Sequence, residues 1–145
     1  DEDEDSVEGA RKFKFASLKS CKRTMEKSLR SYAGDSSLVV DVTRQTMVFM
    51  DVETLTRCFA LIAADETVQI LKVKNWLHPS FDSSFSAGYR HVLLNCLIRA
   101  QDGFSETLGV EGFLVELQLT LECFFRLKVE QGHKRYVNFR NLRGE

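Results

Sequence analysis

The segment FLVELQLTL constrains the fold more than any other stretch of the chain. From Val115 to Leu121 every second residue is apolar, which is the period of a strand with one buried face. The positions between them hold Glu116, Gln118 and Thr120. This second face is either exposed to water, as is common in a small sheet, or it forms the floor of a site.

The rest of the chain alternates between helical and strand patterns. The order predicts a helix at 17–33, a strand at 38–50 with a polar interruption near 41–44, a helix after the N-cap Asp51, a strand at 67–77, a loop at 78–88, a strand at 89–99, a polar hairpin connection at 100–112, a strand at 113–121 and a helix at 122–142. This order predicts an α+β fold, with helices flanking a mixed sheet of four or five strands.

Pairing of the last two strands decides how the polar positions are arranged. If the strand at 89–99 runs antiparallel to FLVELQLTL, then Tyr89, His91 and Asn95 can share a face with Glu116, Gln118 and Thr120, and the register decides whether they do. A slip of one residue in register would reverse this arrangement.

Charge is unevenly distributed along the 145 residues, although the net charge is only −1. Residues 1–10 are acidic, without aromatic residues, and are expected to form a disordered extension, with a single domain at 11–145. The segment 11–30 carries eight Lys and Arg against Glu26 alone. It is either an ordinary solvated helix or an anion site.

Two further features bear on location. No apolar run reaches the roughly 18 residues of a membrane span, so no membrane partner is expected. The four cysteines are scattered without a CxxC motif and fall in apolar or helical patterns, which favours reduced core thiols in the cytoplasm or another reducing compartment.

The chain has no initiator Met, so we expect it to be part of a longer protein with a possible protein partner.

Four short segments, in this order, resemble the synthetase domain of the RelA/SpoT family over about residues 11–136: VVDVTRQTMVF, LKVKNWL, AGYRHVLLN and FLVELQLTL. Enzymes of that family transfer pyrophosphate from ATP to the ribose 3′-hydroxyl of GDP or GTP. The resemblance implies a nucleotidyltransferase-like fold, with Mg²⁺ as cofactor, ATP as donor and a guanine nucleotide as acceptor.

The resemblance also implies roles for individual residues. Asp41 and Glu116 match the two carboxylates that serve metal binding and base chemistry, and Gln118 completes the E-x-Q motif. Tyr89, after Gly88, matches the tyrosine that stacks on the guanine. Both residues also have purely structural alternatives, since Asp41 could cap a helical turn and Tyr89 could be a half-buried strand residue.

The remaining matches are cations. The basic first helix of the family faces the ATP phosphates, and a lysine follows on the second strand. The corresponding candidates here are Lys14, Lys19, Lys22, Arg23, Arg44, Lys72 and Lys74. Lysines of an amphipathic helix are also ordinary surface charges.

Three positions depart from the family pattern. Leu93 stands where a His is usual, and Thr46 and Thr120 stand where Arg is usual; Arg44, two residues before Thr46, is a candidate substitute. Two functions follow. One is Mg²⁺-dependent pyrophosphate or nucleotidyl transfer from ATP to a nucleotide or an RNA 3′ end. The other is a catalytically degenerate domain that binds a nucleotide or a protein.

Overall fold

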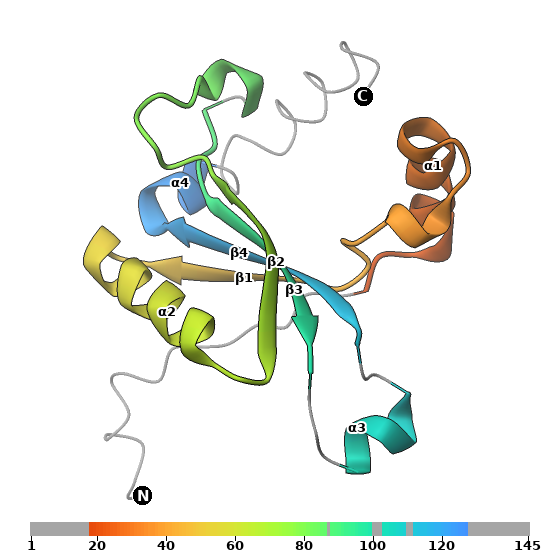
Figure 1. Cartoon of the computed structure of the whole chain (residues 1–145). Coiled ribbons are helices and arrows are strands. Elements are labelled where there is room, and N and C mark those ends of the chain that lie inside the picture. The colour runs from red at the N-terminus through yellow and green to blue at the C-terminus, as the bar shows by residue number, and fades with distance from the viewer. Residues whose placement is uncertain (1–17, 87, 100–102, 110–111, 128–145) are drawn as a thin grey trace, which may run out of the picture.

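A computed structural model describes residues 18–86, 88–99, 103–109 and 112–127 of the chain (Figure 1). The elements are α1 (Cys21–Tyr32), β1 (Arg44–Phe49), α2 (Val52–Ala64), β2 (Val68–Asn75), β3 (Val92–Ile98), α3 (Gly103–Leu108), β4 (Leu114–Leu121) and α4 (Glu122–Leu127), with short 3₁₀ turns at Ser36–Leu38 and Ser83–Ser86. The predicted α+β class is confirmed.

The strands form one sheet in the order β1-β4-β3-β2. β1 runs parallel to β4, whereas β3 is antiparallel to both β4 and β2. The sheet is therefore mixed, as predicted, and β4 lies inside it between two neighbours. Both faces of β4 are consequently shaped by side chains from adjoining strands.

Local sequence explains where the two longer helices begin. Asp51 caps α2, because its carboxylate accepts a 2.7 Å hydrogen bond from the backbone N–H of Thr54. Ser20 caps α1 in the same manner through the N–H of Arg23. α1 ends at Ala33, which adopts a left-handed conformation with φ of 51° and is followed by Gly34.

One face of the sheet forms the core under α2. Leu55 of α2 is buried with Leu94 and Leu119 from the centre of the sheet, and Phe59 and Ile62 pack against the same cluster. Leu94 and Leu119 are fully buried. Figure 1 shows α2 on this side of the sheet and α1 on the other.

The chain between α1 and β1 departs from the strand prediction. Residues 38–50 do not form one strand, since Asp35 accepts from the N–H of Ser37 and caps a 3₁₀ turn there. The strand begins only at Arg44. A second correction concerns the connection at 100–112, which contains the short helix α3.

Other predictions fall partly outside the described residues. The helix predicted at 122–142 is observed from Glu122 to Leu127 as α4, and its remainder and the acidic extension at 1–10 lie outside the described chain. All four cysteines are described and free, but Cys21 and Cys123 are exposed, so the expectation of core thiols is wrong for these two.

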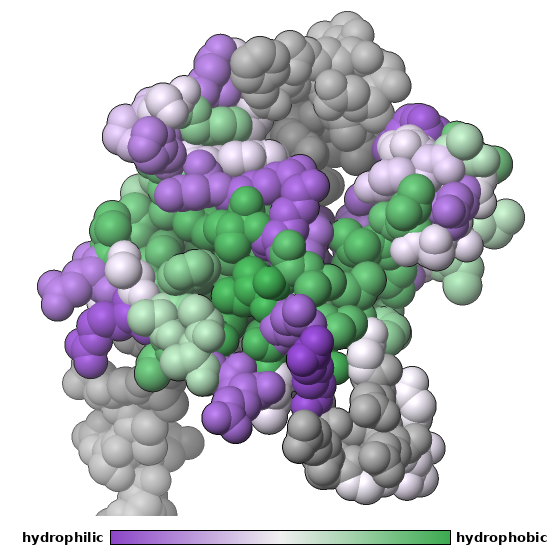
Figure 2. Space-filling view, viewed as in Figure 1, coloured by the Kyte–Doolittle hydropathy of each residue, from purple (hydrophilic) through white to green (hydrophobic). Residues whose placement is uncertain are grey.

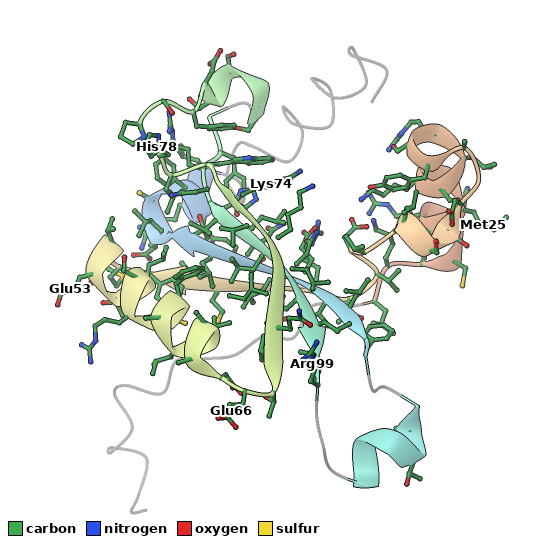
Figure 3. All side chains as sticks on the ribbon, in the orientation of Figure 1. Met25, Glu53, Glu66, Lys74, His78 and Arg99 are labelled. Carbon is green, nitrogen blue, oxygen red and sulfur yellow. The ribbon has the colours of Figure 1, made fainter. Side chains whose placement is uncertain are left out.

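The predicted amphipathic helix is present as α1, but no described element covers its apolar side. Leu18, Met25 and Leu29 are exposed by 69%, 64% and 70%. Figure 3 shows Met25 on the side of α1 that points away from the sheet. No helix in the described ranges has both the length and the apolar character needed to cross a bilayer.

β2 forms one edge of the sheet. Its Leu71 and Val73 remain about half exposed. Figure 2 shows the resulting apolar area over the middle of the molecule, bordered by polar side chains. On the same strand, Lys72 and Lys74 are exposed and alternate with these apolar residues, which is a common way to keep an edge strand from pairing with another chain.

Candidate active site

The polar face of β4 is buried, so it is not simply a wet surface. Glu116, Gln118 and Thr120 are exposed by 8%, 5% and 0%. Val115 and Leu117, which point to the core side, are only half-buried. Burying polar groups costs free energy unless they are hydrogen-bonded. This face therefore needs defined partners.

Strand register collects the predicted polar residues in rows across the sheet. Opposite residues of paired strands share a face, so the pairings with β4 and β3 define each row. The first row is Arg44, Glu116, Asn95 and Lys72, and the next is Thr46, Gln118, Leu93 and Lys74. The predicted sharing of a face between β3 and β4 is thus confirmed. Figure 3 shows Lys74 extending toward the side of the sheet on which α1 lies.

Some of the polar side-chain atoms on this face have hydrogen-bond partners in the described chain, and others do not. The Gln118 side-chain amide donates to Oε1 of Glu116 at 2.8 Å. The side-chain oxygens of Gln118 and Asn95 are buried, and neither has a hydrogen-bond partner within the described chain. Such acceptors normally find a donor, so a ligand with N–H or O–H groups would fit here.

Asp41 lies in the turn before β1 and is 8% exposed. Nζ of Lys27 lies 2.9 Å from its Oδ1, and Lys19 donates to its Oδ2. The backbone N–H of Lys19 also donates to the carbonyl of Val42 at 3.0 Å, which ties the start of α1 to this turn. Asp41 is therefore the centre of an ion-pair cluster, and the cap of the neighbouring 3₁₀ turn is Asp35 instead.

Burial and charge act in opposite directions on this cluster. Burial alone would raise the pKa of Asp41, but hydrogen bonds and charges from Lys19 and Lys27 hold it below its ordinary value. Burial, together with the charges of Lys27 and Arg44, lowers the pKa of Lys19 below its ordinary value, although the hydrogen bond and charge of Asp41 act to raise it. Two lysines thus bind one carboxylate, and the charge of Arg44 reaches one of them, Lys19.

The lowered pKa of Asp41 predicts an acid-dependent loss of stability. Its ion pairs contribute fully above the ordinary Asp pKa of about 3.9, and this contribution is lost as pH falls through the lower folded value. Urea unfolding between pH 7 and 3 should therefore show a steeper decline for the wild type than for Asp41→Asn. Asp35 and Asp65 also have lowered pKa values, from hydrogen bonds with Ser37 and Thr67, but they titrate in both proteins and cancel. Parallel curves of unfolding free energy against pH for the two proteins would contradict the lowered pKa of Asp41.

The chain segments that carry the two predicted carboxylates adjoin. The backbone N–H of Glu116 donates to the carbonyl of Thr43 at 3.0 Å, two residues after Asp41. The side chains have different partners, however, since Asp41 binds lysines and Glu116 binds Gln118. Over the described ranges, no group of three or more His, Cys, Asp or Glu side chains forms a ready metal site. Shared metal binding by the two acids stays a prediction.

Tyr89 is half-buried in the segment just before β3. Its ring lies 4.8 Å from that of His91, at an angle of 32°. Burial raises the pKa of its hydroxyl, whereas a hydrogen bond with Thr120 and the charge of Arg44 act in the opposite direction. These contacts place Tyr89 beside β4, on the polar face. Its stacking on a base stays a prediction.

The other predicted cations have different positions. Arg44, Lys72 and Lys74 are exposed at the edges of the polar rows, and Lys22 and Arg23 are exposed on α1. Lys14 lies outside the described residues. Lys27, on α1, was not predicted as a site residue.

No protein-family model matches the chain, and no curated protein matches it by sequence. Its structure is similar to small alarmone synthetase 2 from Bacillus subtilis, with a TM-score of 0.66 and 20% identity over 86% of this chain and 62% of that one. Small alarmone synthetase 1 from Bacillus subtilis, solved with its product pppGpp, gives 0.64 and 16% over 85% and 60%. A GTP pyrophosphokinase family protein from Streptococcus pneumoniae gives 0.62 and 15% over 86% and 59%.

These similarities concern the fold. The chain has the RelA/SpoT-like synthetase fold, as its sequence predicted, and it spans about three fifths of the length of these solved proteins. RNA 3′ ends and protein partners have no support from these neighbours.

Proposed function

We propose that the chain transfers a pyrophosphate group from ATP to the ribose hydroxyl of a second nucleotide, with Mg²⁺ as cofactor. The observation that carries this proposal is the buried Glu116 carboxylate, held by Gln118 in a polar row that adjoins the Asp41 cluster. The similarity to synthetases that act on nucleotides supports it.

In this reaction the acceptor hydroxyl oxygen attacks the β-phosphorus of ATP. The bond between that phosphorus and the α–β bridging oxygen breaks, and AMP leaves with the electron pair. The hydroxyl proton must be taken up, and Glu116 is the proposed base. Gln118 donates to one carboxylate oxygen of Glu116, which fixes the side chain and leaves its other oxygen for the proton.

Phosphoryl transfer depends mainly on positioning and on neutralising charge. Lys19 and Lys27 both bind the Asp41 carboxylate, and the charge of Arg44 reaches Lys19, so the positive charge gathered here suits an anion such as the triphosphate of ATP. Lys72 and Lys74 add positive charge at the opposite edge of the same face. The phosphates are proposed to lie between these groups.

The donor set fits Mg²⁺ as a site that substrate completes. Mg²⁺ binds one or two protein carboxylates together with phosphate oxygens and water, and Asp41 and Glu116 are the acids that would hold it. When bound, the ion neutralises charge on the phosphate oxygens. The lysines on Asp41 have to share or release that carboxylate, which the phosphates would favour by attracting them.

The acceptor is proposed to be a guanine nucleotide. The buried oxygens of Asn95 and Gln118 are hydrogen-bond acceptors without partners in the described chain, and guanine presents N–H donors on its Watson–Crick edge. Tyr89 would supply a ring for stacking, which is worth roughly 1–3 kcal/mol per base in other nucleic-acid binders.

Incubation with ATP labelled at the γ-phosphate tests the proposal. With MgCl₂ and a panel of GDP, GTP, ADP and UDP, label should move to the guanine nucleotides with equal release of AMP, and EDTA should prevent this. Binding of nucleotides without transfer would instead indicate a degenerate binding domain. Release of labelled phosphate without AMP would indicate a different reaction.

A further inference from the structure

Arg90 holds the loop between β2 and β3 in place. Its guanidinium donates to three backbone carbonyls, those of Trp76 at 3.3 Å, His78 at 3.1 Å and Phe81 at 2.9 Å. The same group lies 5.7 Å from the centre of the Phe81 ring. A planar guanidinium with five donors can bridge several acceptors at once, so one side chain fixes three points of this loop.

The anchored loop completes a column of aromatic rings. Phe81 stacks on Trp76, with centroids 5.1 Å apart and ring planes 3° from parallel. Trp76 meets His91 edge-on at 4.5 Å, and His91 lies 4.8 Å from Tyr89. The column therefore runs from the loop to Tyr89 on the polar face.

The backbone around Arg90 is tied on both sides. The Thr120 hydroxyl donates to the Arg90 carbonyl at 2.9 Å, and the Ser86 hydroxyl donates to the Tyr89 carbonyl at 2.6 Å. The N–H of Trp76 donates to the His91 carbonyl at 2.9 Å. Arg90 lies between Tyr89 and His91, just before β3, and its side chain binds the loop carbonyls.

We propose that Arg90 is a positioning residue for the acceptor nucleotide. It orders the loop and the ring column, and these hold Tyr89 in place before the acceptor arrives. The inference rests on the proposed function, because it assumes that Tyr89 receives the acceptor base. A small displacement of a group that positions substrate can cost about 10²-fold, so loss of Arg90 should weaken acceptor use by that order and leave ATP use unchanged.

Trp76 is the only tryptophan of the chain and lies inside the column, so its fluorescence reports on this region directly. We would compare Arg90→Met and Arg90→Lys with Arg57→Met, a control on the exposed side of α2. Acrylamide quenching of Trp76 in the free protein, the Kd for GDP from the Trp76 signal, and the separate KM values for GDP and ATP are the readouts.

Arg90→Met should make Trp76 more accessible to acrylamide and raise the Kd and KM for GDP about 10²-fold, with KM for ATP unchanged. Arg90→Lys keeps the charge but cannot bridge three carbonyls, so its Trp76 quenching and its Kd and KM for GDP should stay close to those of Arg90→Met. Unchanged quenching or unchanged GDP affinity in Arg90→Met would overturn the inference, as would equal losses for GDP and ATP. A wild type that binds GDP without transferring pyrophosphate would contradict the proposed function alone. A wild type that binds no GDP would overturn both.

Discussion

Glu116→Gln is expected to lower the rate of pyrophosphate transfer by about 10²–10⁴-fold, the usual contribution of a general base. The substitution keeps the shape of the side chain and an oxygen that can accept from Gln118, so the 2.8 Å contact can persist. It removes the negative charge and the ability to take the acceptor proton. The fold should be retained, because the apolar core lies on the other face of the sheet.

The measurement is kcat with ATP, GDP and Mg²⁺, together with the thermal unfolding curve of each protein. Glu66→Gln is the matched control, since Glu66 is an exposed carboxylate just after α2 (Figure 3). The control should keep wild-type activity. If Glu116→Gln were folded and equally active, Glu116 would not be the base, and the proposed mechanism would be wrong.

The shared polar face of β3 and β4 was predictable from sequence. Alternation specifies which residues of a strand point to the core, and burial of that apolar set fixes the register. The pairing of Asn95 with Glu116 is the direct result. Alternation did not predict that Glu116, Gln118 and Thr120 would be more buried than Val115 on the core side, because burial depends on what lies above the face.

The Asp41 cluster and the surroundings of α1 were not predictable in the same way. Apolar spacing shows that one side of α1 is hydrophobic, but it does not show which segment covers it, and Met25 is in fact exposed. A lysine on a helix is usually a solvated charge, so Lys27 gave no signal by itself. Its contact with Asp41 depends on how the turn before β1 is placed, which no local pattern encodes. The composition of residues 38–40, which includes two β-branched valines, predicted a strand. The chain instead forms a 3₁₀ turn at Ser36–Leu38, capped by Asp35.

Lys27→Met is expected to produce the second large effect. It should weaken the use of ATP and strengthen the binding of Mg²⁺ in the absence of nucleotide. Lys27 provides one of the ammonium groups in the cation cluster around Asp41. If it moves to a phosphate of ATP, its removal should lower kcat/KM for ATP by about 10- to 150-fold, because a hydrogen bond to a charged group contributes about 1.5–3 kcal/mol. The acceptor KM should change little.

Without nucleotide, the same variant should bind a divalent cation more tightly than the wild type. In the free protein two ammonium groups occupy the Asp41 carboxylate, so a metal ion must compete with them, and removing Lys27 removes half of that competition. Calorimetric titration with MgCl₂ alone measures this, and Arg30→Met, at the exposed end of α1, is the control. Tighter Mg²⁺ binding together with weaker ATP use would show that Lys27 exchanges between carboxylate and phosphate. Weaker ATP use without tighter Mg²⁺ binding would leave Lys27 as a phosphate ligand but contradict its competition with the metal for Asp41. If neither ATP use nor Mg²⁺ binding changed, Lys27 would not belong to the site.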